Sequence, residues 1–268
     1  MTRIETLPRS TTRGKATIPI AILLLLAVAD GDALAWQSPA EPTLNQSDHP
    51  SERISDREIV KRIDAAVYER TNTLARYTGK EQYDIYRNGE TNPSAQMTVQ
   101  TVYSYTSGKD YTLTSQSGSQ LMRTVILDKV LEGEREMARA DTRESIWLTS
   151  ANYEMRPEPG TVAMNGRQCL IVDLKARRKS PHLFTGKLWV DASDFSVLRL
   201  QGIPAQNVSV FIGQISVLRD YARIDGFSMA THTEAHSHSF LLGDTVMKID
   251  YTDYQIQRGA TAAWVPSR

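Results

Sequence analysis

Three of the five histidines in this chain lie within ten residues, in the stretch THTEAHSHSF at 231–240. In an extended strand, successive side chains alternate between the two faces, so His232, Glu234, His236 and His238 would project from one face. Imidazole and carboxylate groups bind transition metals, and imidazole also changes charge near neutral pH. The stretch therefore predicts either a metal site or a polar strip along one wall of a binding site.

The spacing of these side chains favours the polar strip over the metal site. Neighbours on one face of a strand are ~6.8 Å apart. A closed metal site made from Glu234, His236 and His238 would thus need a further ligand from a neighbouring strand, such as Asp253. We expect the histidines to meet the polar end of a ligand, and their protonation to tune its release.

Sequence patterns of the common enzyme classes do not occur in the chain. It contains no G-x-S-x-G turn, no G-x-x-x-x-G-K-[ST] loop, no G-x-G-x-x-G and no H-E-x-x-H. Asp191 and Asp194 could form a carboxylate pair, but they flank a turn, where we expect them to bond the backbone. We therefore expect a protein without enzymatic activity or cofactor; the alternative is a metal-dependent enzyme built on His232, His236 and His238.

The N-terminal residues predict export. Basic residues at 3, 9, 13 and 15 precede the apolar run IPIAILLLLAVA and then the sequence Ala33-Leu34-Ala35, which is the order of a signal peptide with its cleavage site. The run is too short for the ~20 residues of a membrane span, although an uncleaved anchor is the alternative. We expect a signal peptide at 1–35, cleaved after Ala35, a flexible polar leader at 36–54 and one domain at 55–268 in the periplasm.

The charge balance and the cysteine content limit the classes of partner and the kinds of cross-link that this domain can have. Lys and Arg number 31, as do Asp and Glu, so no basic excess points to nucleic acid. The only cysteine is Cys169, so no disulfide forms within the chain, and its apolar setting predicts a buried thiol. We expect a monomer whose core alone stabilises it.

Periodicity predicts a mainly β domain with two covering helices. Ser55 and Glu58 form a capping-box pattern before apolar residues at helical spacing, and residues 121–137 place apolar side chains on one helical face. From Tyr77 the period is two, and turn pairs such as Asn88-Gly89 and Asp225-Gly226 recur between the segments. The expected fold is α+β, a large curved antiparallel sheet forming a half-open barrel that two or more amphipathic helices cover.

Two turns set the face on which the histidines would lie. We expect Asp225-Gly226 and Gly243-Asp244 to be two-residue turns, which puts the histidine row on the more apolar, concave face. One extra residue would reverse this assignment. The predicted opposite pairs are His232 with Arg219, Glu234 with Val217 and Asp253, His236 with Ile215 and Tyr251, and His238 with Ile249.

The segment LFTGKLWVDASDFSVLRLQG at 183–202 carries a family resemblance. Its order, a strand ending in G-x-x-W-V-D, a short turn and a strand ending in V-L-R-L-x-G, resembles the periplasmic outer-membrane lipoprotein-sorting proteins, a lipoprotein-carrier-like family. The segments LRDYARIDGFSMATHTEA and LLGDTVMKIDYTDYQI follow in similar order. The specific part of the resemblance is 183–257, and the order of elements extends it to about 55–258.

This resemblance implies a half-barrel with an apolar interior that accepts acyl chains. We expect a binding protein for a hydrophobic ligand, lipid or the acylated part of lipoproteins, in lipoprotein sorting or envelope lipid transport, with a possible transient membrane-protein partner. The alternative is a lipid-sensing module that controls a membrane partner. The residues expected to line the cavity are Leu188, Val190, Leu198, Leu200, Ile215, Val217, His232, His236, His238, Met247, Ile249 and Tyr251.

Overall fold

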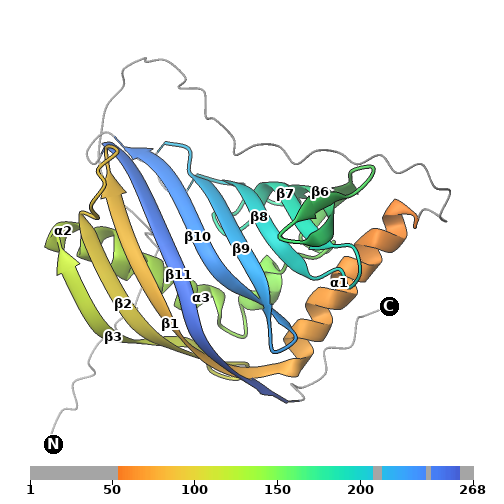
Figure 1. Cartoon of the computed structure of the whole chain (residues 1–268), viewed down its shortest axis with the longest axis horizontal. Helices are drawn as coiled ribbons and strands as arrows, with labels where there is room; N and C mark the ends of the chain where they lie inside the picture. Colours follow the sequence, from red (N-terminus) through yellow and green to blue (C-terminus); the bar gives the residue numbers. More distant parts are fainter. Residues whose placement is uncertain (1–53, 208–212, 240–242, 260–268) are drawn as a thin grey trace, which may run out of the picture.

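One antiparallel sheet of 11 strands forms the body of the molecule (Figure 1). The computed structural model describes residues 54–207, 213–239 and 243–259. Its strands are β1 (Leu74–Arg87), β2 (Ala95–Ser104), β3 (Gly108–Gly118), β4 (Tyr153–Pro157), β5 (Val162–Met164), β6 (Arg167–Ala176), β7 (Phe184–Asp191), β8 (Val197–Pro204), β9 (Ser216–Ile224), β10 (Phe227–Ser239) and β11 (Gly243–Arg258).

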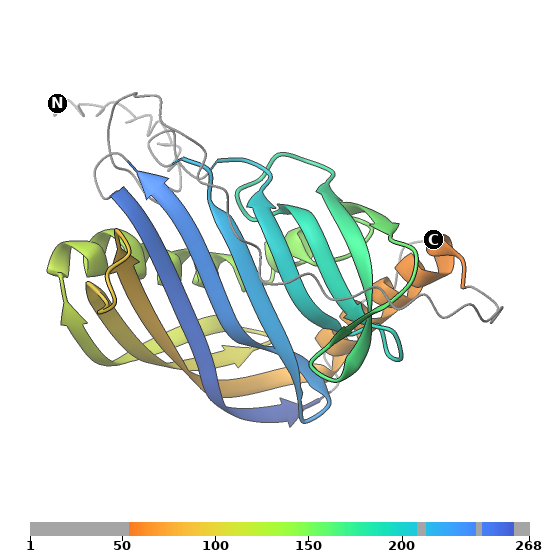
Figure 2. The same cartoon turned by 45° about the horizontal axis from the view of Figure 1, so that its top comes forward.

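Strands that pair are also consecutive in sequence except at two places, where β1 pairs with β11 and β4 pairs with β6. The order is β3-β2-β1-β11-β10-β9-β8-β7-β6-β4, with β5 paired to β6. The first and last strands of this order do not pair with each other, so the sheet stays open along β3 and β4. Its curvature around the helices is plain in Figure 2. The expected mainly β half-barrel is thus confirmed.

Left-handed turn residues fix two of its hairpins. Asn165 and Gly166 have φ of 50° and 76°, and Asp225 and Gly226 have φ of 49° and 83°. Positive φ at both central residues is the requirement of a type I′ turn, whose twist matches that of the flanking strands. The prediction of a turn at Asp225-Gly226 is confirmed.

Helix α1 (Asp56–Thr73) covers one end of the sheet. The Ser55 side chain accepts a hydrogen bond from the Glu58 backbone N–H (3.3 Å), which caps the helix as the sequence predicts. Ile59 and Ile63 are buried against side chains of β6, β7 and β8. Burial of these apolar side chains fixes α1 on that part of the sheet.

A second helical segment covers the other end. It comprises α2 (Gln120–Met122), a π-helical turn η1 (Arg123–Leu127) and α3 (Asp128–Met137), which follow one another without a break. Its buried residues, Met122, Ile126, Leu127 and Leu131, pack on β1, β2 and β11. The helix expected at 121–137 is confirmed, and a short 3₁₀ helix, η2 (Arg143–Ile146), follows it.

Both helical layers lie on the same face of the sheet, which is called the inner face below. Residues 1–53 lie outside the described residues, and so do the predicted signal peptide and nearly all of the predicted leader. Among the described helices, none combines the length and the apolar character that crossing a membrane requires.

Candidate functional site

Two apolar clusters cover most of the inner face. The cluster beneath α1 contains Leu188, Val190 and Leu200, and the cluster beneath α2–α3 contains Met247, Ile249 and Tyr251. All six were expected to line the cavity, and all six are buried or partly buried. The register places Val217 on the same face, because it lies opposite Ala235, two residues from the buried Thr233.

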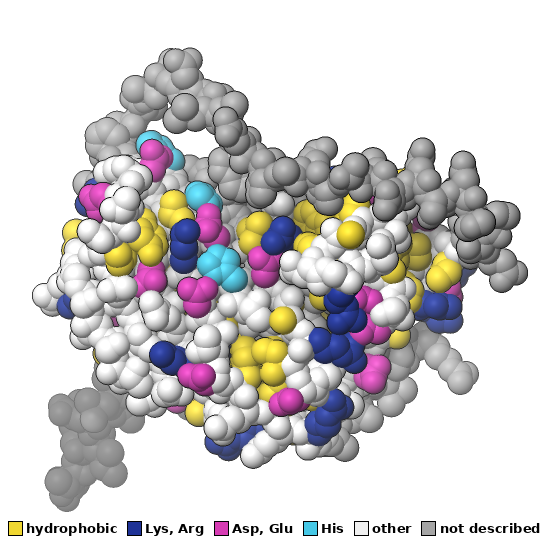
Figure 3. Space-filling model, in the orientation of Figure 1, with side chains coloured by type: hydrophobic (Ala, Val, Ile, Leu, Met, Phe, Trp, Pro, Cys, Tyr) yellow, Lys and Arg dark blue, Asp and Glu magenta, His cyan; other side chains and the backbone are white. Residues whose placement is uncertain are grey.

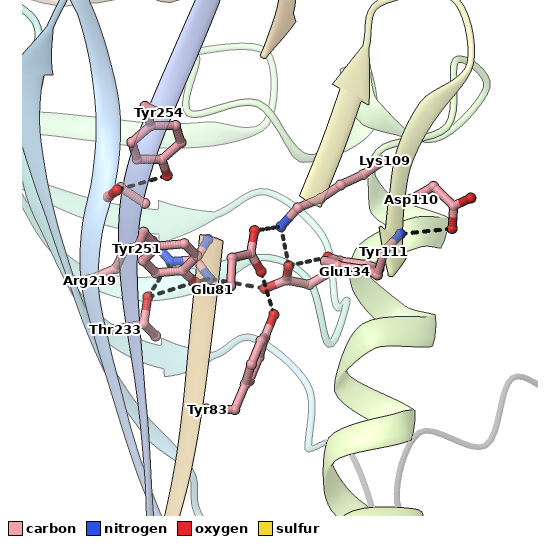
Figure 4. A network of polar contacts seen from close by, with 11 residues as sticks. Glu81, Tyr83, Lys109, Asp110, Tyr111, Glu134, Arg219, Thr233, Tyr251 and Tyr254 are labelled. Atoms are coloured by element: carbon pink, nitrogen blue, oxygen red, sulfur yellow. Dashed lines mark hydrogen bonds and ion pairs between the residues drawn. The ribbon is translucent and has the colours of Figure 1, made fainter. Parts of the chain in front are cut away.

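A buried ionic network joins α3 to the inner face (Figure 4). Glu134 of α3 accepts hydrogen bonds from Lys109 Nζ (2.5 Å) and Tyr111 Oη (2.6 Å), both on β3. Lys109 also pairs with Glu81 Oε1 of β1 at 2.8 Å, and Arg219 Nη2 of β9 lies 3.7 Å from Glu134 Oε1. We call Glu81, Lys109, Glu134 and Arg219 the ionic latch.

Tyrosine and threonine hydroxyls extend the ionic latch along the sheet. Tyr83 donates a hydrogen bond to Glu81 Oε2 (2.5 Å). Arg219 donates from Nε to Thr233 Oγ1 (2.9 Å) and from Nη2 to Tyr251 Oη (3.5 Å). The network therefore contacts β1, β3, β9, β10, β11 and α3, and hydrogen bonds offset the cost of burying its charges.

The electrostatics of the ionic latch keep its acid charged. Burial alone would raise the pKa of Glu134, but Lys109, Arg219 and the hydrogen bond from Tyr111 outweigh it and lower the pKa to about 2. Burial would lower the pKa of Lys109, whereas Glu134 and its other neighbours raise it well above its usual value. Two positive and two negative groups thus balance one another; three of them are buried, and the Arg219 side chain is 32% exposed.

This arrangement holds a helix over an apolar surface. The apolar sides of α2–α3 and the sheet face each other, and Glu134 forms the buried ionic contacts between α3 and the inner face. A second, exposed ion pair joins α3 to β3, between Arg135 and Asp110 at 3.1 Å.

The predicted histidine register is wrong at both hairpins. The turn at Asp225-Gly226 forms, but a β-bulge between Ala230 and His232 shifts the pairing, so Thr233 rather than His232 lies opposite Arg219. Likewise, β11 begins at Gly243, opposite Ser239, so Gly243-Asp244 is not the turn. Each shift moves the register by an odd number of residues, which carries the row to the other face.

The histidine row consequently lies on the outer face of the sheet. His232 Nδ1 is 2.6 Å from Asp250 Oδ1, His238 Nδ1 is 2.7 Å from Asp244 Oδ1, and His236 contacts Glu234. Figure 3 shows these histidines among acidic and basic side chains on the face that looks away from α2 and α3. His232, Glu234 and His236 border a surface hollow of about 210 Å³. The prediction that they face the apolar interior is wrong.

Two other expected cavity residues also lie elsewhere. Leu198 packs with Val162 and Cys169 in a separate cluster on the outer face, because a bulge near Val190 turns it away from the interior. Ile215 precedes β9 and is half-buried. Within the described residues, no group of three or more histidine, cysteine or acidic residues is arranged to hold a metal ion. This applies also to Glu234, His236 and His238, the alternative metal site of the sequence analysis.

Other sequence interpretations are confirmed. Asp191 Oδ1 accepts from the Ser193 backbone N–H (2.8 Å), and Asp194 Oδ1 from that of Ser196 (2.9 Å). These carboxylates therefore serve the turn. Cys169 is fully buried, and burial raises the pKa of its thiol.

The ionic latch itself is not among the predicted site residues, although the sequence contains a signal for it. Glu81 occupies the face of its strand that Tyr83 and Ile85 occupy, and Glu134 shares a helical face with Leu127 and Leu131. A charge at an otherwise apolar position predicts a buried partner. The sequence does not say which cation that partner is, since Lys109 and Arg219 are distant in the chain.

Comparison with known proteins gives likenesses of structure alone. No model of a known protein family and no curated protein sequence matches the chain. Among solved structures, a LolA superfamily protein from Nitrosomonas europaea is 11% identical with a TM-score of 0.41, covering 76% of this chain and 94% of that one. A DUF1329 family protein from Desulfovibrio piger is 12% identical with a TM-score of 0.38, covering 74% and 92%.

A third structure belongs to the same comparison. A domain classed as an outer membrane lipoprotein-sorting protein, from Vibrio parahaemolyticus, is 10% identical with a TM-score of 0.43, covering 73% of this chain and 91% of that one. With TM-scores below 0.5, none of these likenesses establishes a ligand or a partner for this chain.

Proposed function

We propose that this chain is a periplasmic binding protein for a hydrophobic ligand, lipid or the acylated part of lipoproteins, acting in lipoprotein sorting or envelope lipid transport. The observation that carries the proposal is the apolar inner face beneath α2–α3, to which the ionic latch joins α3. The export signal predicted from the sequence and the resemblance of residues 183–257 to lipoprotein-sorting proteins support it.

The binding step follows from burial. Each methylene that moves from water to the apolar cluster contributes about 0.8 kcal/mol, so an acyl chain gains affinity without any covalent step. Access requires α2–α3 to separate from β1, β2 and β11, which exposes the apolar sides of both layers. An acyl chain between them would restore the lost contacts and keep the helix displaced.

The ionic latch gives this opening a defined cost. When α3 lifts, Glu134 leaves Lys109 and Arg219, and water solvates all three groups. A charged cluster of this kind favours the closed state without adding to the apolar surface that a ligand would cover. Ligand affinity thereby stays moderate, which a protein that hands its ligand on requires.

A binding experiment tests the proposal. The mature protein is purified from its own envelope and examined by native mass spectrometry for bound lipid. It is then titrated with a fluorescently labelled fatty acid and with a di-acylated lipopeptide, and we expect saturable binding of at least one of these. An empty protein that is indifferent to both probes contradicts the proposal.

The variant Glu134→Gln separates binding under α3 from adsorption to the surface. We expect faster uptake and faster release of the labelled fatty acid, because the neutral amide weakens the ionic latch. The matched control is Glu132→Gln on the same helix, where Glu132 pairs with Lys129 and has a side chain 67% exposed. If Glu134→Gln and Glu132→Gln take up and release the fatty acid at the same rates, the ligand does not bind beneath α3.

A further inference from the structure

Strand β3 leaves one backbone edge of the sheet unpaired. It pairs with β2 alone, and all of residues 112–118 are exposed. Ser119 N–H donates to the Ser94 carbonyl (2.8 Å), and antiparallel residues alternate, so Ser117 and Ser115 direct their backbone groups to β2. Gln116 lies between them, which directs its N–H and C=O away from β2 to the free edge.

Strand β3 has a β-bulge near Thr114 and two charged residues at its start, Lys109 and Asp110, but its second half lacks the charge and proline common at sheet edges. Edges are ordinarily blunted by shortness, charge or proline, yet residues 111–120 (YTLTSQSGSQ) contain no charged residue and no proline. The opposite edge, β4, is protected: it has five residues, ends in Pro157 and carries the pair Glu154–Arg156. Of the two edges, only β3 has a long uncharged stretch, residues 111–118, which follows the charged Lys109 and Asp110 at its start.

The surroundings of β3 suit an extended chain. A groove of about 760 Å³ lies between the first half of β3 and α3, lined by residues 108–112 and by Glu132, Arg135, Glu136 and Arg139. Val102, Leu113 and Leu121 are 37%, 49% and 58% exposed, which makes them three of the four large exposed apolar residues in the described part of the chain.

We propose that the free edge of β3 binds an extended, uncharged peptide segment of a partner protein as an additional strand. The backbone groups of residues such as Gln116 supply the hydrogen bonds, and Leu113 and Leu121 contact apolar side chains of the peptide. The absence of charge along residues 111–120 favours a segment that is itself uncharged. The backbone edge of residues 112–118 lies outside the apolar cluster beneath α2–α3, although the groove beside it shares Lys109 and α3 with the ionic latch.

The chain itself offers a suitable probe. Residues 95–101 of β2 (AQMTVQT) form an uncharged strand that pairs with β3 in the fold. A fluorescein-labelled, amidated peptide of this sequence is titrated into the mature protein and followed by anisotropy. We expect saturable binding. Two further forms of the peptide carry N-methyl groups on alternate residues, one form on the even-numbered and the other on the odd-numbered positions. Only one of these two forms should bind, because a peptide strand pairs through one of its edges.

Gln116→Pro is the matching change in the protein. Proline removes the outward N–H of an edge strand without breaking a bond to β2. We expect at least about a tenfold loss of affinity for the probe, which corresponds to about 1.4 kcal/mol, whereas Gln116→Ala keeps the wild-type value because it retains the backbone N–H. The far-ultraviolet circular dichroism of both variants checks their fold.

Three outcomes would overturn the proposal. They are wild-type protein that does not bind the probe, folded Gln116→Pro protein that binds it as well as wild type, and equal binding of both N-methylated forms. If sedimentation shows a wild-type dimer that Gln116→Pro converts to a monomer, a second copy occupies the edge and the proposed partner is wrong. If Gln116→Pro does not fold, the two N-methylated peptides test the proposal on the wild-type protein alone.

Discussion

Glu134 joins α3 to two strands of the sheet through ion pairs with Lys109 of β3 and Arg219 of β9. Glu134 and Lys109 each have side chains only 10% exposed, so removing one charge leaves the other buried without its partner. We expect Glu134→Gln to lower the free energy of unfolding by about 3 kcal/mol, the order of the cost of breaking a buried ion pair by removing one partner. Urea denaturation at pH 7 measures this difference, and Glu132→Gln should stay within about 0.5 kcal/mol of wild type.

The same carboxylate predicts how stability varies with acid. Because the pKa of Glu134 is lower in the folded state, its contribution is present above pH 4.5 and is lost as the pH falls towards about 2. Wild type should therefore lose stability over this window more steeply than Glu134→Gln. Urea midpoints measured between pH 5 and pH 2 check it. Parallel curves for the two proteins would show that Glu134 is not paired in solution.

At the scale of elements, two glycines determine how closely β7 and β8 approach. Gly186 and Gly202 are the glycines of the G-x-x-W-V-D and V-L-R-L-x-G patterns, and they lie opposite each other. A Cβ on Gly186 would lie 2.1 Å from the Gln201 carbonyl oxygen, and one on Gly202 would lie 2.5 Å from that of Thr185. The resemblance in this segment therefore has a structural cause, the close contact of two backbones.

Gly186→Ala should consequently destabilise the protein by about 2 kcal/mol or more, because the strands must separate to admit the methyl group. The control is Gly133→Ala in α3, where an added Cβ meets nothing within 4 Å. That change should raise stability by about 1 kcal/mol, since alanine favours helix over glycine. Thermal unfolding of both variants measures the effects, and a neutral Gly186→Ala would contradict the close approach.

The sequence alone predicts which helices, strands and turns form better than it predicts on which face of the sheet a side chain lies. Turn chemistry at Asp225-Gly226, the cap at Ser55 and the apolar spacing of 121–137 are local, and all three are confirmed. The bulge near Thr231 is not signalled by any residue type, yet it reverses the face of every later side chain in β10. The face on which the histidines lie could therefore not be predicted from the sequence. The inner positions of Leu188, Val190 and Ile249 could be predicted.

For the whole molecule, the single sheet keeps two surfaces with different chemistry apart. The inner face carries the apolar clusters and the ionic latch, while the outer face carries the histidines with their carboxylate partners. Any charge on these histidines would lie across the sheet from an acyl chain on the inner face. Coupling between the two surfaces would have to pass through the backbone of β10 and β11.

This separation predicts that the histidines do not govern ligand release. We expect His236→Gln combined with His238→Gln to bind the labelled fatty acid as wild type does, at every pH from 5.5 to 7.5. The comparison with Glu134→Gln, whose substitution lies on the inner face, shows that the assay detects a change in the acyl site. A pH dependence present in wild type and absent from the histidine variant would mean that outer-face charge reaches the inner face through the sheet.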